Sequence, residues 1–180
     1  MYWEKLDGFF SFQPFYEKMV NQLSDGVFVE LGVWKGRSIM YMAERAKELN
    51  KNINLHGVDL FVVGDQQQHC AKLGNDFYNE VIKNIEPMKD CITLHQMSSH
   101  DAYSLFEDES IDFLFIDAHH TYEDVKRELE LWYPKVKTNG IISGHDYIWI
   151  GAVIKKAVDE FFGVENVVVE EGDSWSVVKR

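Results

Sequence analysis

The stretch FVELGVWKGRS, residues 28–38, joins an apolar run to a bend that contains two glycines, Gly32 and Gly36. The run is typical of a buried strand, and the apolar spacing that follows predicts a helix opening near Ser38. Glycine allows close approach and positive φ, while a helix start directs free N–H groups and a positive dipole end outward. The stretch therefore predicts a strand, a ligand-binding bend and a helix; a bend that needs glycine only for packing is the alternative.

Apolar runs of strand length recur at residues 53–61, 91–97, 111–118 and 140–146. They are nearly continuous, which favours strands that are covered on both faces. Segments with helical spacing separate them, and Thr121 with Asp124 three residues later predicts the start of one such helix. Two short apolar runs on either side of residues 171–173 indicate a final hairpin. We expect an α/β fold whose sheet is mostly parallel, with the last strand antiparallel.

Length and composition set outer limits on the function. A chain of 180 residues favours a single domain spanning residues 1–180. The net charge of −12 disfavours nucleic acid and anionic membranes as partners, and we expect a soluble, cytoplasmic protein because no signal peptide or long apolar segment is present. Cys70 and Cys91 lack metal-type spacing and are expected to be reduced thiols. The aromatic residues 1–24 predict either a lid or a homodimer contact.

The acids near the bend restrict its ligand. The spacing from Glu30 to Gly32 and Gly36 is not the G-x-G-x-x-G of dinucleotide folds, which disfavours a pyrophosphate. A carboxylate at Glu30 would instead attract an ammonium or sulfonium group. Asp59, at the end of the second run, is placed to bind ribose hydroxyls; a strand-end cap for a neighbouring turn is the alternative.

Taken together, FVELGVWKGRS, GVDLF, the segment from Asp112 to Tyr147 and the final hairpin resemble class I S-adenosylmethionine-dependent methyltransferases, in their small O-methyltransferase-like branch. The resemblance extends from about Pro14 onward and implies a three-layer, Rossmann-like methyltransferase fold with a seven-stranded sheet. It also implies that S-adenosylmethionine lies on the bend. The cofactor contacts that it implies are Glu30, Gly32, Trp34, Gly36, Ser38, Asp59, Leu60, Ser98, Ser99, Asp117 and His119. A helix N-cap is the alternative role for Ser98 or Ser99.

A second group of ionisable residues follows two of the apolar runs: Asp117, His119, His120, His145 and Asp146. Such convergence at a sheet edge is a signal of a functional site. We predict catalytic roles for His120 as general base, for His145 as the next candidate and for Asp117.

A divalent ion such as Mg²⁺ on Asp117 and Asp146 is the alternative means of activating a hydroxyl. Catechol-type O-methyltransferases, which the chain resembles, use acids at matching strand ends. The sequence departs from their pattern at Tyr147, where they place an amide ligand, and His119 stands where this branch often has Asp. Metal dependence therefore stays open.

The expected function is methyl transfer to a hydroxyl of a small molecule. An NAD-type oxidoreductase, a metal-dependent hydrolase and a nucleoside-binding protein without catalysis are the alternatives. Residues 61–74 form a long irregular stretch that predicts a mobile flap over the pocket, and nothing in the sequence identifies the acceptor.

Overall fold

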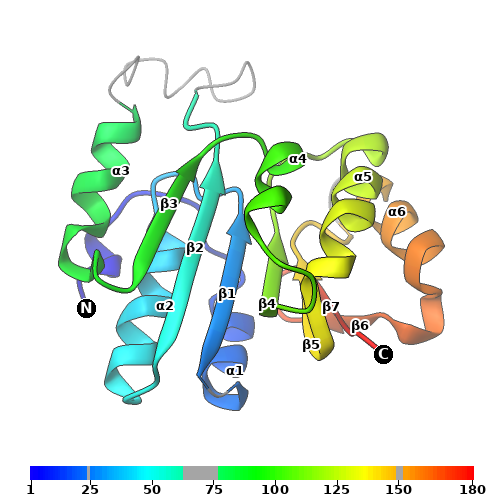
Figure 1. Ribbon diagram of the computed structural model, residues 1–180, viewed down its shortest axis with the longest axis horizontal. Helices are drawn as coiled ribbons and strands as arrows, with labels where there is room; N and C mark the ends of the chain where they lie inside the picture. The colour runs from blue at the N-terminus through cyan, green and yellow to red at the C-terminus, as the bar shows by residue number, and fades with distance from the viewer. Residues whose placement is uncertain (24, 63–76, 149–151) are drawn as a thin grey trace.

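The computed structural model describes residues 1–23, 25–62, 77–148 and 152–180. Its strands are β1 Gly26–Leu31, β2 Ile53–Asp59, β3 Ile92–Gln96, β4 Ile111–Ile116, β5 Val136–Gly144, β6 Val168–Glu170 and β7 Ser174–Val178. They form a seven-stranded sheet in the order β3-β2-β1-β4-β5-β7-β6 (Figure 1). β1 to β5 pair in parallel, whereas β7 is antiparallel to both of its neighbours. The predicted α/β fold with a reversed last strand is confirmed.

Helices cover both faces of this sheet. The α-helices are α1 Gln13–Gln22, α2 Arg37–Glu48, α3 Phe77–Ile85, α4 Ser99–Ala102, α5 Tyr122–Trp132 and α6 Val153–Phe162. Short 3-10 turns are η1 Trp3–Lys5, η4 Glu86–Met88, η5 Tyr103–Leu105, η6 Tyr133–Lys135 and η7 Val164–Asn166. One core lies between the sheet and α1, α2 and α3, and a second lies between the sheet and α4, α5 and α6. This arrangement has the expected three layers.

The starts of two helices fix the loops that precede them. Thr121 caps α5, because its hydroxyl accepts a hydrogen bond from the Asp124 N–H at 3.1 Å, as predicted. α4 begins at Ser99, and the chain continues as η5. Its start is fixed by Ser98, whose hydroxyl accepts from the His100 N–H at 3.1 Å.

The amino-terminal segment, residues 1–12, packs on its own chain. The backbone N–H groups of Tyr2 and Trp3 donate to the Glu44 carboxylate of α2, and Phe12 is 4% exposed. Burial within the chain therefore accounts for most of this aromatic composition. The predicted flap falls mainly on residues 63–76, outside the described residues. Within the part of the chain that the structure describes, no helix combines the length and apolarity needed to cross a bilayer.

Candidate functional site

The candidate site lies at the carboxyl edge of the sheet, where β1 is flanked by β2 on one side and by β4 on the other. Strand order reverses at this point, and ligands of open α/β sheets bind there. The Asp117 N–H donates to the Leu31 carbonyl at 2.8 Å, so the residue after β4 lies against the end of β1. Both predicted clusters therefore meet at one edge.

The glycine bend, residues 32–36, is shaped by backbone constraints. Gly32 has φ +87°, and a Cβ on it would lie 2.0 Å from the Asp117 carbonyl oxygen. Gly36 has φ +83° and precedes α2, which has no side-chain cap hydrogen bond. The close packing at Gly32 agrees with the packing alternative, while the uncapped start of α2 leaves N–H groups that can bind an anion.

Asp59 holds the bend from the neighbouring strand. One carboxylate oxygen accepts from the N–H groups of Val33 and Trp34 at 2.9 and 3.0 Å, and the other accepts from Phe61 N–H at 2.7 Å. A carboxylate offers about four acceptor positions. Three backbone donors therefore leave room for a further donor, such as a hydroxyl of a bound ligand.

The Glu30 carboxyl group is buried and bound by two hydroxyl groups of the chain. Its side chain is 5% exposed, and its carboxyl group accepts from the Tyr16 hydroxyl at 3.0 Å and from the Ser38 hydroxyl at 2.5 Å. Burial raises the pKa of Glu30 to about 8, although these two hydrogen bonds oppose the shift. With this pKa the group is mostly uncharged at neutral pH, and its contact with a cofactor stays a prediction.

The loop after β3, residues 96–99, lies next to Asp59. The Met97 N–H donates to the Asp59 carbonyl at 3.1 Å. Ser98 caps α4, and the Ser99 hydroxyl donates to buried Glu128 at 2.5 Å. Both serine hydroxyls thus have internal partners, and their contact with a cofactor stays a prediction, as does that of Leu60, which is 42% exposed.

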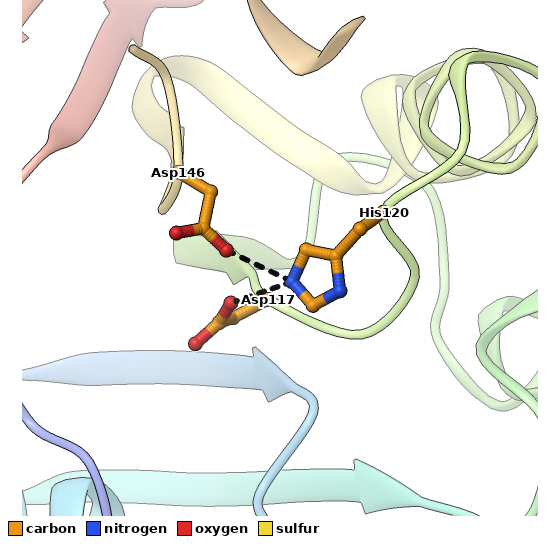
Figure 2. Close-up of side chains that lie close together, drawn as sticks. All are labelled: Asp117, His120 and Asp146. Carbon is orange, nitrogen blue, oxygen red and sulfur yellow. Dashed lines mark hydrogen bonds and ion pairs between the residues drawn. The ribbon is translucent and has the colours of Figure 1, made fainter. Parts of the chain in front are cut away.

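The acid–histidine cluster consists of Asp117, His120, His145 and Asp146. Figure 2 shows the His120 ring pointing toward both carboxylates, with its Nε2 at 3.5 Å from Asp117 and 3.0 Å from Asp146. Nδ1 of His145 lies 3.7 Å from Asp117 and 3.2 Å from Asp146. Two acids and two imidazoles from the ends of β4 and β5 are therefore brought together, as predicted.

His119 turns toward α4 instead, with its ring centroid 5.8 Å from that of His100. Its predicted cofactor contact is not tested by this geometry.

The cluster keeps its imidazoles charged. Hydrogen bonds to Asp117 and Asp146 raise the pKa of His120 to about 10. Burial opposes the charge on His145, but the same two acids outweigh it and raise its pKa to about 10. Burial also opposes the charge on Asp146, yet both imidazoles outweigh it and hold its pKa well below the usual range. In this state neither histidine accepts a proton at neutral pH, so the general-base role stays a prediction.

The donor set fits a divalent cation. One ligand atom from each of Asp117, His120 and Asp146 lies within 4.8 Å of the others. Carboxylate oxygens suit Mg²⁺ or Mn²⁺, whereas an imidazole ligand favours a transition metal over Mg²⁺. Asp146 also has φ +57°. Non-glycine residues adopt this left-handed conformation rarely, and when they do, it is commonly at functional sites.

The amino-terminal segment, for which a lid was one of the two predicted roles, reaches this cluster through a contact with His145 that sequence reasoning did not identify. The Ser11 hydroxyl lies 2.9 Å from Nε2 of His145, and the Phe12 ring centroid is 5.0 Å from that of His145. The aromatic run around Ser11 signals burial, but a contact across 134 residues leaves no local pattern.

Comparisons with known proteins identify a methyltransferase family. A family model described as a methyltransferase domain matches residues 29–147, which include both the glycine bend and the acid–histidine cluster. An uncharacterized protein of Sinorhizobium fredii is 28% identical over 133 residues, which cover 74% of this chain and 14% of that protein. An uncharacterized protein of Acanthamoeba polyphaga mimivirus is 31% identical over 127 residues, covering 68% of this chain and 52% of the relative. The chain thus spans about half or less of these relatives.

Solved structures share the fold at low identity. The O-methyltransferase NovP superimposes with a TM-score of 0.69 and 20% identity, covering 91% of this chain and 76% of NovP. CalS11, a calicheamicin methyltransferase, gives a TM-score of 0.70 at 14% identity, covering 93% of this chain and 77% of CalS11. The sheet and its helices are therefore those of methyltransferases of known structure.

Proposed function

The chain belongs to the methyltransferase domain family, and from this premise we propose that it is a class I S-adenosylmethionine-dependent enzyme that methylates a hydroxyl group of a small molecule with the help of a divalent cation. The observation that carries the proposal is the acid–histidine cluster lying directly against the glycine bend. A hydroxyl held by the cluster would then face a methyl donor held by the bend.

The bend fits the donor in two respects. The uncapped start of α2 suits the donor's carboxylate, and Asp59 retains an acceptor position for a ribose hydroxyl. The remaining expected contacts, including Trp34 and the loop at residues 96–99, are part of the same proposal. When bound, S-adenosylmethionine supplies a methyl group on a sulfonium, which is already a good leaving group.

The protein's task is then to align the acceptor and to handle its proton. Asp117, His120 and Asp146 would hold the cation, which lowers the pKa of a bound hydroxyl. A cation would also compensate the charges of the two acids that keep His145 protonated. His145, which is also in contact with Ser11, is then the side chain placed to accept the proton of the acceptor.

The relatives' names favour a hydroxyl acceptor. NovP is an O-methyltransferase, and CalS11 is also described as a TDP-rhamnose 3'-O-methyltransferase. The net charge of −12 agrees with a small-molecule acceptor in preference to nucleic acid.

The test is a set of thermal unfolding curves with S-adenosylhomocysteine, Mn²⁺, both together, or NAD. Ligand at 100 times its Kd stabilises a protein by about 2.7 kcal/mol, or roughly 5–10 °C for a chain of this size. We expect such a shift with S-adenosylhomocysteine, a further shift with Mn²⁺, and none with NAD. A shift with NAD alone would contradict the proposal, and a response to S-adenosylhomocysteine without any response to Mn²⁺ would remove the cation from it.

A further inference from the structure

Glu128 is a fully buried acid that the reaction as proposed does not use. It lies in the middle of α5 and is 0% exposed. One carboxyl oxygen accepts from the Ser99 hydroxyl at 2.5 Å, and the other has no hydrogen-bond partner among the described residues. Burial raises the pKa of Glu128 to about 7. Burying an acid with one oxygen unsatisfied is costly, so its position calls for an explanation.

Two residues of α5 hold the same serine. Trp132, one turn after Glu128, donates its ring N–H to the Ser99 carbonyl at 2.9 Å. Ser99 is 4% exposed and is the first residue of α4. Both its side chain and its backbone are therefore fixed by α5.

The loop that ends at Ser99 needs such support. α4 is a single turn, Ser99–Ala102, and so short a helix has little stability of its own. The loop begins at the end of β3, and its Met97 N–H binds the Asp59 carbonyl at 3.1 Å. A displacement of Ser99 would therefore be transmitted to the backbone of the residue that is expected to bind ribose.

A second glutamate–serine pair lies on the opposite side of the sheet. Glu30 accepts from the Ser38 hydroxyl at 2.5 Å, the same distance as in the pair of Glu128 and Ser99. Ser38 lies in the first turn of α2, which follows the glycine bend. One buried glutamate thus binds a serine in the first turn of each of the two helices that border the proposed donor site.

We propose that Glu128 is a positioning residue for the donor: through Ser99 it sets the place of loop 96–99, the wall of the nucleoside end of the site beside Asp59. This inference rests on the proposed function, because it assigns the role of one helix in binding the adenosyl group. α5 starts directly after the loop that carries His120, so the same helix borders both the cation site and the nucleoside site.

Three variants separate positioning from simple stabilisation. Glu128→Gln keeps an oxygen that accepts from Ser99, whereas Glu128→Met fills the same space and removes the acceptor. Methionine removes the unsatisfied carboxyl oxygen but leaves the buried Ser99 hydroxyl without its acceptor. Because these two effects oppose each other, we expect a smaller change of melting temperature than a cavity in the core causes. Leu129→Ala is the matched control, since Leu129 is the next residue of α5, is 1% exposed and packs in the core.

The experiment is calorimetric titration of these variants with S-adenosylhomocysteine, with melting temperatures measured in parallel. We expect about a tenfold weaker Kd for Glu128→Met with a smaller loss of melting temperature than in Leu129→Ala, and a Kd within about twofold of wild type for Glu128→Gln. Leu129→Ala should melt at a lower temperature and bind S-adenosylhomocysteine as wild type does. In the ligand-free protein, hydrogen exchange in loop 96–99 should be faster in Glu128→Met than in Leu129→Ala.

Two results would overturn the inference alone: wild-type affinity in Glu128→Met, or equal weakening by Leu129→Ala. Failure of the wild-type protein to bind S-adenosylhomocysteine at all would overturn the proposed function, and this inference with it.

Discussion

Glu30 and Asp146 are buried carboxyl groups at the same edge of the sheet, 5% and 8% exposed, yet they carry different charges at neutral pH. Glu30 lies inside β1, where its partners are the neutral hydroxyls of Tyr16 and Ser38, and its pKa rises to about 8. Asp146 follows β5, where its partners are two imidazoles, and its pKa falls. An acid within a strand serves the packing of the chain, while an acid just beyond a strand is available for chemistry.

The largest expected effect is on cation binding. Asp146→Asn removes an anionic ligand. Loss of a residue that only hydrogen-bonds to a metal ligand already weakens metal affinity by about 10–100-fold, so we expect loss of the ligand itself to weaken Mn²⁺ binding by about 100-fold or more. Glu30→Gln should bind Mn²⁺ as wild type does. Electron paramagnetic resonance of free Mn²⁺ measures the Mn²⁺ affinity of both variants. An equal loss of affinity in Asp146→Asn and Glu30→Gln would contradict the claim that only Asp146 binds the cation.

The next effect concerns the donor. Asp59→Ala removes the acceptor of three backbone N–H groups and of the expected ribose hydroxyl, so S-adenosylhomocysteine should bind about 100-fold more weakly in calorimetric titrations. Asp59→Asn, which keeps one carbonyl oxygen, should lose less. Unchanged affinity in Asp59→Ala would remove Asp59 from the proposed donor site.

The pH dependence of Mn²⁺ binding has a definite sign. The pKa of His120 is about 10 in the folded chain against 6.5 when unperturbed, so a proton competes with the cation at neutral pH. Mn²⁺ affinity should therefore rise between pH 6 and pH 9, with up to about tenfold gain per pH unit for one displaced proton. Titrations in buffers of different ionisation enthalpy count the protons released. Affinity that stays flat over this range would show that the cation does not replace the proton of His120.

The free energy of unfolding at high pH should show whether Glu30 is neutral in the folded chain. The pKa of Glu30 is about 8 in the folded chain against 4.5 when unperturbed, so the stability that its neutral form contributes is present below pH 4.5 and lost as pH rises through 8. Glu30→Gln has no such loss. We expect its melting temperature to exceed that of wild type by roughly 5 °C at pH 9 and by less at pH 6. A gap that does not widen with pH would show that Glu30 is ionised.

The smallest effect is expected at the amino-terminal segment. Ser11→Ala removes an exposed hydrogen bond to His145, which contributes about 0.5 kcal/mol, or roughly 1–2 °C in melting temperature. Ser104→Ala, which loses a hydroxyl bond to the Asp101 carbonyl, is the control for an exposed serine. If Ser11→Ala lowers melting by no more than the control does, the contact with His145 contributes nothing.

Much of the fold was predictable because its signals are local. Continuous apolar runs gave the parallel strands, and Thr121 with Asp124 gave the start of α5. The start of α4 was predicted only as one of two alternatives for its serines, because a serine before a single turn can serve equally as a cap or as a ligand contact. The hydrogen-bond partners that influence the charge of the buried glutamates could not be predicted from a sequence pattern, because they are distant in the chain. Tyr16 lies 14 residues from Glu30, and Ser99 lies 29 residues from Glu128. Strand ends therefore placed the acids correctly but could not distinguish a charged acid from a neutral one.

The most direct test of the account is the position of a Mn²⁺ ion in crystals of the protein, located by its anomalous scattering. We predict one strong peak in contact with Asp117, His120 and Asp146, and none beside Glu30. A strong peak elsewhere on the chain, or none at these three residues in crystals soaked at a concentration that shifts melting in solution, would contradict the claim that the acids beyond β4 and β5 form the cation site.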